Sequence, residues 1–147
     1  NLRVIDIEQA GEKFTELDLS SNDKLNSLGL EGLRGLKQLK MPETDNLKEL
    51  VVKETALESL GIEKYTKLDK VCVGGNQFNT LKINMEQKTE KDIENMYLLF
   101  DNNLKVDFIS SKNGIVPNIK RLDNHDLWAG IVFSNYVVTD YEIPECW

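Results

Sequence analysis

The fold is decided by residues 14–52, FTELDLSSNDKLNSLGLEGLRGLKQLKMPETDNLKELVV. Apolar residues occur here as triplets with the spacing apolar-x-x-apolar-x-apolar. Seven consecutive triplets are Phe14/Leu17/Leu19, Leu25/Leu28/Leu30, Leu36/Leu39/Met41, Leu47/Leu50/Val52, Leu57/Leu60/Ile62, Leu68/Val71/Val73 and Phe78/Leu81/Ile83. An outlying first copy is Leu2/Ile5/Ile7. Steps of 10 or 11 residues between the seven triplets indicate an internally repeated structure.

The repeat is a strand repeat and not a helical one. A helical stripe needs apolar residues at i, i+3, i+4 and i+7, whereas the third member of each triplet falls at i+5. The second and third members are two residues apart and therefore point to one face of a strand. Pro42 and the Gly74-Gly75 pair would also interrupt helices of the required length.

Two half-repeats make a turn of 21 or 22 residues, which is within the range of leucine-rich solenoids. The stretch Val71-x-Val73-x-x-Asn76-x-Phe78-x-x-Leu81-x-Ile83 resembles the leucine-rich repeat consensus, and so does the stretch from Leu17 to Leu30 with Asn22. The doubled rhythm is most similar to the short repeats of bacterial surface and secreted proteins, especially those of Bacteroidetes. This resemblance implies parallel strands on both halves of each turn, little helix, and a stacked Asn position. Asn22 and Asn76 match that position, while Thr44 and Glu54 occupy it elsewhere.

The rhythm stops after Ile83, so the sequence predicts a solenoid over 1–85 and a small α+β C-terminal cap over 86–147. Thr89 begins a capping signal, and residues 93–100 carry apolar side chains at i, i+3, i+4 and i+7, which predicts a short amphipathic helix. The alternative is a strand, Leu98-x-Phe100-x-x-Asn103, that resumes the repeat. Alternating residues also predict strands at 104–108, 131–133 and 136–139.

In each triplet, the residue between the second and third apolar members points outward, because side chains alternate along a strand. These outward residues are predicted to form two columns. One column reads Asp18, Lys40, Gly61 and Lys82, and the other reads Gly29, Val51 and Cys72. Asp18, Lys40, Lys82, Val51 and Cys72 are therefore the candidate binding surface. Neighbouring strands also place opposite charges side by side, as Glu31 with Lys53, Glu49 with Lys70, and Asp18 with Lys40. Such pairs stabilise a sheet without any ligand, so the charges are either solvated sheet surface or part of a binding face.

The composition narrows the classes of function. A net charge of −7 argues against sequence-independent binding of nucleic acid, and no apolar run approaches the length of a membrane span. The cysteines, Cys72 and Cys146, allow at most one internal disulfide. Fourteen of the 15 leucines before residue 84 belong to the triplets, and only Leu33 does not. The leucines therefore leave no room in residues 2–85 for buried catalytic polar groups.

Chemistry-bearing motifs are sparse. The sequence has no Gly-x-Ser-x-Gly and no phosphate-binding loop. His125, the single histidine, lies between Asp123 and Asp126 and reads either as a surface loop or as a metal or ligand site. Cap aromatics that read either as core or as sugar-stacking residues are Trp128, Tyr136, Tyr141 and Trp147.

The sequence thus predicts a monomeric, non-enzymatic recognition module without catalytic residues, metal or cofactor. Its rigid surface would bind a protein partner. Similarity to the bacterial short-repeat group implies a secreted or surface-displayed protein and host or envelope partners. The alternative function is a small-ligand binder or enzyme with its site around His125.

Overall fold

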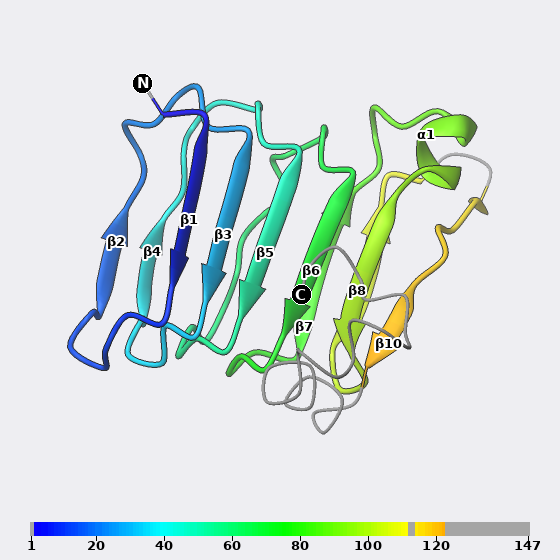
Figure 1. Cartoon of the computed structure of the whole chain (residues 1–147). Helices are drawn as coiled ribbons and strands as arrows, with labels where there is room; N and C mark the ends of the chain where they lie inside the picture. The colour runs from blue at the N-terminus through cyan, green and yellow to red at the C-terminus, as the bar shows by residue number, and fades with distance from the viewer. Residues whose placement is uncertain (1, 112–113, 123–147) are drawn as a thin grey trace, which may run out of the picture.

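The protein is a solenoid of short parallel strands (Figure 1). The structure is a computed structural model, and it describes residues 2–111 and 114–122. The strands are β1 (Val4–Glu8), β2 (Glu16–Asp18), β3 (Ser27–Glu31), β4 (Gln38–Lys40), β5 (Glu49–Lys53), β6 (Lys70–Gly74), β7 (Thr80–Asn84), β8 (Tyr97–Asp101), β9 (Lys105–Ile109) and β10 (Lys120–Leu122). The helix described within these residues is α1 (Glu90–Glu94). This architecture confirms the predicted solenoid of parallel strands with little helix.

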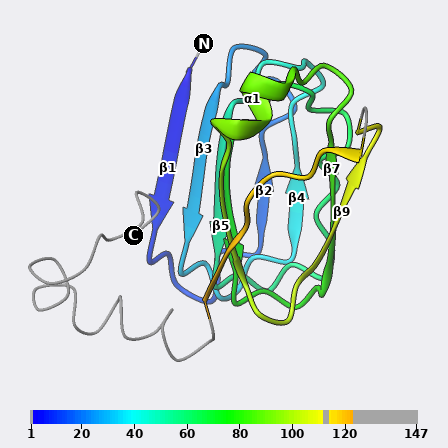
Figure 2. The same ribbon diagram turned by 90° about the vertical axis from the view of Figure 1, so that its right-hand side faces the viewer.

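The strands form two sides of the coil. Sheet A contains six strands in the order β1-β3-β5-β6-β8-β10, and it runs across residue 85 without a break. The opposite side holds sheet B, which pairs β2 with β4, and sheet C, which pairs β7 with β9. Viewed along the coil in Figure 2, β1, β3 and β5 lie on one side and β2, β4, β7 and β9 on the other. The triplets therefore alternate between the two sides as the chain advances.

The core lies between the two sides and is filled by the triplet residues. Leu28, Leu30, Leu50 and Val52 are almost completely buried, as the alternation along β3 and β5 requires. Leu33, which lies outside the triplets, is also fully buried. The apolar spacing in the sequence thus gives the inward face of each strand correctly, and the core takes additional leucine from a turn.

Side chains join successive turns where the strand ladders stop. The Tyr65 hydroxyl donates to the Pro42 carbonyl at 2.6 Å, and the Asn84 amide donates to the Glu63 carbonyl at 2.9 Å. The Thr44 hydroxyl makes the same kind of bond to the Asp23 carbonyl at 2.7 Å. Each of these bonds spans 21 to 23 residues, which is about one turn of the coil. Backbone carbonyls outside the sheets therefore find partners on the next turn.

One predicted half-repeat does not form a strand. Leu57, Leu60 and Ile62 are buried as the triplet predicts, but the segment has no ladder partner in either neighbouring turn. The residue types do not explain this difference, because Ser27 and Gly29 hold the same positions in β3, which pairs with both β1 and β5. Without a ladder over this segment, sheets B and C are separate, and the predicted column through Gly61 is interrupted there.

The helix predicted over 93–100 is wrong beyond its first turn. Thr89 caps α1 with the predicted capping box, in which Asp92 bonds back to the Thr89 backbone, but the helix ends at Glu94. Tyr97–Asp101 instead form β8, paired with β6 and β10, so the alternative strand is right. Leu98, Leu99 and Phe100 are all buried, so β8 reads as a continuous apolar run. Such a run cannot be assigned to helix or strand from its periodicity.

Candidate functional site

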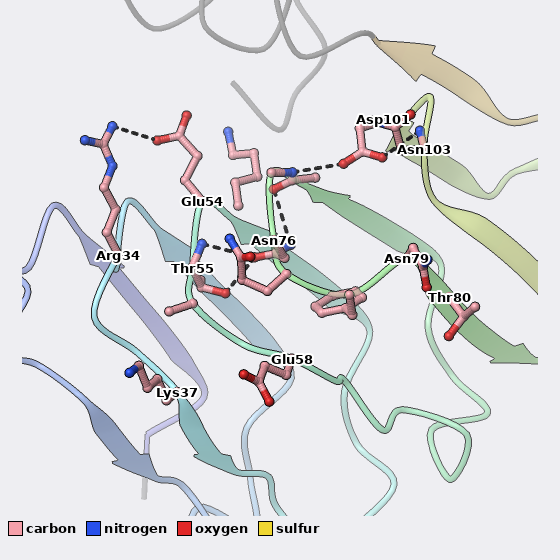
Figure 3. Close-up of a pocket in the computed structure, with 16 residues that line it drawn as sticks. Arg34, Lys37, Glu54, Thr55, Glu58, Asn76, Asn79, Thr80, Asp101 and Asn103 are labelled. Carbon is pink, nitrogen blue, oxygen red and sulfur yellow. Dashed lines mark hydrogen bonds and ion pairs between the residues drawn. The ribbon is translucent and has the colours of Figure 1, made fainter.

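A polar cleft lies where three neighbouring strands of sheet A end. It has a volume of about 890 Å³ and is bordered by the ends of β5, β6 and β8. Figure 3 shows Arg34 and Glu54 on one side, Asp101 and Asn103 on the other, and Thr55 with Asn76 between them. Asn79, Thr80, Lys37 and Glu58 complete the labelled lining. This volume is within the usual range for ligand-binding pockets.

Asn76 holds the floor of the cleft. Its side-chain oxygen accepts from the Thr55 backbone N–H at 3.1 Å and from the Thr55 hydroxyl at 2.6 Å. Its amide nitrogen donates to the carbonyls of Val52 and Gly74 at 3.0 and 3.2 Å. The side chain thereby joins two turns, as the resemblance to leucine-rich repeats implies for this position. Because these bonds use its oxygen and its amide hydrogens, Asn76 has a structural role.

Asp101 holds the far wall. Its carboxylate accepts from the Gly75 N–H at 3.0 Å and from the Asn103 N–H at 3.1 Å. Gly75 has φ of +69°, a left-handed conformation that glycine adopts at little cost. The Arg121 guanidinium donates to the Asp101 carbonyl at 2.8 Å and so fixes this corner from β10. The cleft wall is therefore rigid on the β8 side.

Glu54 is the unusual residue of the cleft. It has φ of +54°, and the equivalent positions in neighbouring turns are Gly32 and Gly75. The expectation that Glu54 occupies the Asn position is therefore wrong, because the same register aligns Thr55 with Asn76. The Glu54 side chain is 10% exposed, and its Oε2 lies 3.3 Å from Nη2 of Arg34. Its Oε1 is buried and has no hydrogen-bond partner. A non-glycine residue in this conformation and an unpaired buried oxygen each cost roughly 1–3 kcal/mol.

Lys53 adds a buried cation beside Glu54. Its ammonium lies 2.9 Å from Glu31 Oε1, and its side chain is only 5% exposed. Burial lowers the pKa of Lys53, and the hydrogen bond and charge of Glu31 oppose that shift. Lys53, Glu54 and Thr55 are all buried, so residues 2–85 hold buried polar groups beside the leucine core. These groups lie at a strand end, where the backbone turns and side-chain alternation no longer holds.

The predicted apolar column is in register but does not present Cys72 as a contact surface. Gly29, Val51 and Cys72 face one another across β3, β5 and β6, as expected. Cys72 is fully buried and disulfide-bonded, and it packs with the buried Leu99 while Val51 lies against them half-buried. The chain's other cysteine, Cys146, lies outside the described residues.

The predicted polar column is divided between two sheets. Asp18 and Lys40 pair across sheet B with 3.6 Å between Oδ2 and Nζ, and both are well exposed. Hydrogen bonds from Ser20 lower the pKa of Asp18, and Lys40 adds to that shift. Lys82 lies in sheet C, opposite Asp107. Lys40 and Gly61 instead line a hollow of about 570 Å³ beside the segment that forms no strand.

The other predicted charge pairs have different outcomes. Glu31 and Lys53 form the expected ion pair, which is largely buried. Glu49 and Lys70 are in register, while the Ser27 hydroxyl donates to Glu49 at 3.1 Å. The predicted ligand site at Asp123, His125 and Asp126 lies outside the described residues, as do the predicted strands at 131–133 and 136–139 and the aromatics Trp128, Tyr136, Tyr141 and Trp147.

The apolar repeat pattern does not identify Arg34 and Glu54 as residues of the candidate site. A signal for Glu54 exists in the repeat itself, because aligning the turns places it with Gly32 and Gly75, where a charged residue is unexpected. Side chains of the cleft offer carboxylates, amides, hydroxyls and cations. Such groups bind a polar ligand through hydrogen bonds.

Comparison with protein-family models, curated proteins and solved structures finds no match to this chain. Over residues 2–111 and 114–122, no helix has the length and apolar character needed to cross a membrane. The same residues contain no group of three or more His, Cys, Asp or Glu side chains arranged to hold a metal ion. The fold is therefore assigned from the chain's own structure.

Proposed function

We propose that this chain is a non-enzymatic recognition module that binds its partner at the polar cleft. The observation that carries the proposal is Glu54, a strained and buried carboxylate with one unpartnered oxygen beside a cleft of about 890 Å³. Strain and missing hydrogen bonds concentrate at functional sites. The surrounding residues are fixed by bonds between turns, so binding orders few groups.

The partner that fits this module best is a protein on a host or envelope surface, and the chain acts as a secreted or surface-displayed monomer. The support for this compartment is the similarity of the repeat to short bacterial leucine-rich repeats. A solenoid offers an extended preformed surface, which is the usual way such folds bind proteins. The solenoid architecture of the chain supports the binding of such a partner.

The test is capture of partners from envelope and host-cell extracts with the wild type and two variants. Thr80→Arg places a long side chain into the cleft from an exposed position. Lys82→Glu changes an exposed residue on the same strand, outside the cleft. Specific capture that Thr80→Arg abolishes and Lys82→Glu retains would support the cleft. Equal capture by all three chains would contradict it.

A further inference from the structure

The unpartnered oxygen of Glu54 indicates which ligand the cleft selects. Oε1 is buried in this conformation and has no donor, so a ligand that draws the Glu54 side chain toward the cleft can supply the hydrogen bond that the fold leaves open. This oxygen differs from those of Asp101, whose carboxylate accepts from two backbone N–H groups. The ligand therefore needs a hydrogen-bond donor at Glu54.

The charges of the cleft favour a neutral donor. Arg34 already lies against the other oxygen of Glu54, and Glu31 lies against Lys53. The lining contains three cations, Arg34, Lys37 and Lys53, and three carboxylates, Glu54, Glu58 and Asp101. A ligand with net charge would meet an unfavourable partner on one wall, whereas a neutral ligand would not.

The remaining lining resembles a surface for a polyhydroxylated ligand. Gln77, Asn79 and Thr80 are exposed along one rim, and the exposed Asn103 also lines the cleft. Amides and hydroxyls can both donate to and accept from sugar hydroxyls. Phe78 is half-buried among them and supplies an apolar ring. Polar rims and one aromatic ring match the alternating hydroxyl and C–H surfaces of a sugar.

We propose that the cleft binds a neutral oligosaccharide, with the Glu54 side chain turning toward the cleft so that a sugar hydroxyl donates to its Oε1. This inference rests on the proposed function and names the ligand class of the same cleft. The glycan would belong to the surface that the module recognises. The arrangement of Glu54, Arg34 and the amide rim sets the orientation of the bound sugar.

The direct test is saturation-transfer-difference NMR of the full chain with maltohexaose, chitopentaose and a mannose tetrasaccharide as neutral probes. A heparin octasaccharide and a hexa-arginine peptide serve as charged probes. We expect at least one neutral probe to bind and both charged probes to fail. Binding by a charged probe alone, or by none of the five, would overturn the inference.

Two variants test the role of Glu54. Glu54→Gln replaces the charged acceptor by a neutral amide, to which a sugar hydroxyl bonds more weakly, so binding of the neutral probe should weaken roughly 10-fold. Glu63→Gln is the matched control, because Glu63 is an exposed carboxylate outside the cleft. It should change binding less than about 2-fold. An equal effect of both variants would overturn the assignment of Oε1.

Two measurements keep these outcomes distinguishable. Thermal unfolding shows whether Glu54→Gln is folded. If it is unfolded, Thr80→Arg is the second test, because it blocks the cleft from its rim and should abolish sugar binding. Failure of every neutral probe with retained, Thr80→Arg-sensitive capture of a protein would overturn the carbohydrate inference and leave the recognition module standing.

Discussion

The two sides of this solenoid are built from the same triplet repeat but differ in how their strands pair. On one side, six strands form one continuous sheet, and most of them are five residues long. On the other, two pairs of strands are separated by residues 57–62, which remain buried without a ladder. Side-chain bonds between turns, such as that from Tyr65 to Pro42, stand in place of the missing ladder. The comparison shows that an apolar triplet specifies burial but not pairing, because residues 27–30 and 59–62 share the pattern Ser-Leu-Gly-apolar and only the first segment forms a strand.

The largest expected difference between the two sides is in the core. Leu50→Ala in sheet A should lower the free energy of unfolding by roughly 2–5 kcal/mol, because Leu50 is completely buried. Leu39→Ala in sheet B should cost about 1–2 kcal/mol, because Leu39 is half-buried. Urea unfolding of the two variants measures both values. Equal losses would mean that the sides contribute equally to the core.

The bond from Tyr65 tests how the side without a continuous ladder is held. Tyr65→Phe should lower the free energy of unfolding by roughly 1–3 kcal/mol, because the buried hydroxyl leaves the Pro42 carbonyl without its donor. Burial raises the pKa of Tyr65 to about 12, with Glu43 and Asp45 adding to the shift.

The raised pKa gives this variant a pH signature. The neutral phenol is favoured in the fold, so its contribution is complete below pH 10 and is lost as the pH rises toward about 12. The difference between wild type and Tyr65→Phe in urea unfolding should therefore shrink over that interval. A difference independent of pH would contradict the role of the hydroxyl.

Substitutions at Glu54 and Gly75, which follow the ends of neighbouring strands in sheet A, test the backbone strain at the cleft. Glu54→Gly should raise the free energy of unfolding by about 1 kcal/mol, because it relieves the left-handed conformation and removes the unpaired oxygen. Gly75→Ala at the next corner should lower it by about 1–2 kcal/mol, since a Cβ there would lie 3.2 Å from Glu54 Cγ in a left-handed residue. Thermal unfolding compares the two. Destabilisation by both changes would show that Glu54 is placed there for stability.

The smallest effects concern the cross-strand ion pairs. Removing the exposed Lys40 from sheet B should leave the melting temperature unchanged within error, because solvent screens its pair with Asp18. The buried Lys53 of sheet A should behave differently. Its lowered pKa means that the folded chain binds fewer protons than the unfolded chain between the lowered pKa and 10.5.

It follows that the wild type gains stability relative to Lys53→Met as the pH rises through that interval. Lys40→Met is the control and should show no such trend. Denaturation midpoints at pH 8 and 10.5 measure the difference. A trend shared by both variants would place its origin elsewhere in the chain.

The sequence predicts what repeats and misses what departs from the repeat. Leu28, Leu50 and Val71 could be assigned to the core because each lies in a triplet. β8 could not, because Leu99 is buried as well as Leu98 and Phe100, and alternation disappears when both faces are covered. The periodicity of an amphipathic helix then fits the same letters.

The candidate site was missed for a related reason. The apolar pattern predicts which side chains are buried, and it assumes that charged side chains stay exposed to water. Lys53 and Glu54 violate that assumption at the end of β5, where Lys53 is the last residue of the strand and Glu54 follows it. Ion pairs with Glu31 and Arg34 offset part of the cost of their burial. In the aligned turns, only Gly32 and Gly75 indicate that the chain adopts a left-handed conformation at this position.

The bonds that join turns have a consequence for how this molecule grows. Those from Thr44, Tyr65 and Asn84 each reach back 21 to 23 residues, so each needs only the turn before it. Inserting a single residue would misalign one pair of turns, whereas duplicating a whole turn would recreate every bond in the copy. The chain can thus lengthen by copying itself, and a cleft formed at one corner can be kept, repeated or lost without redesigning the rest.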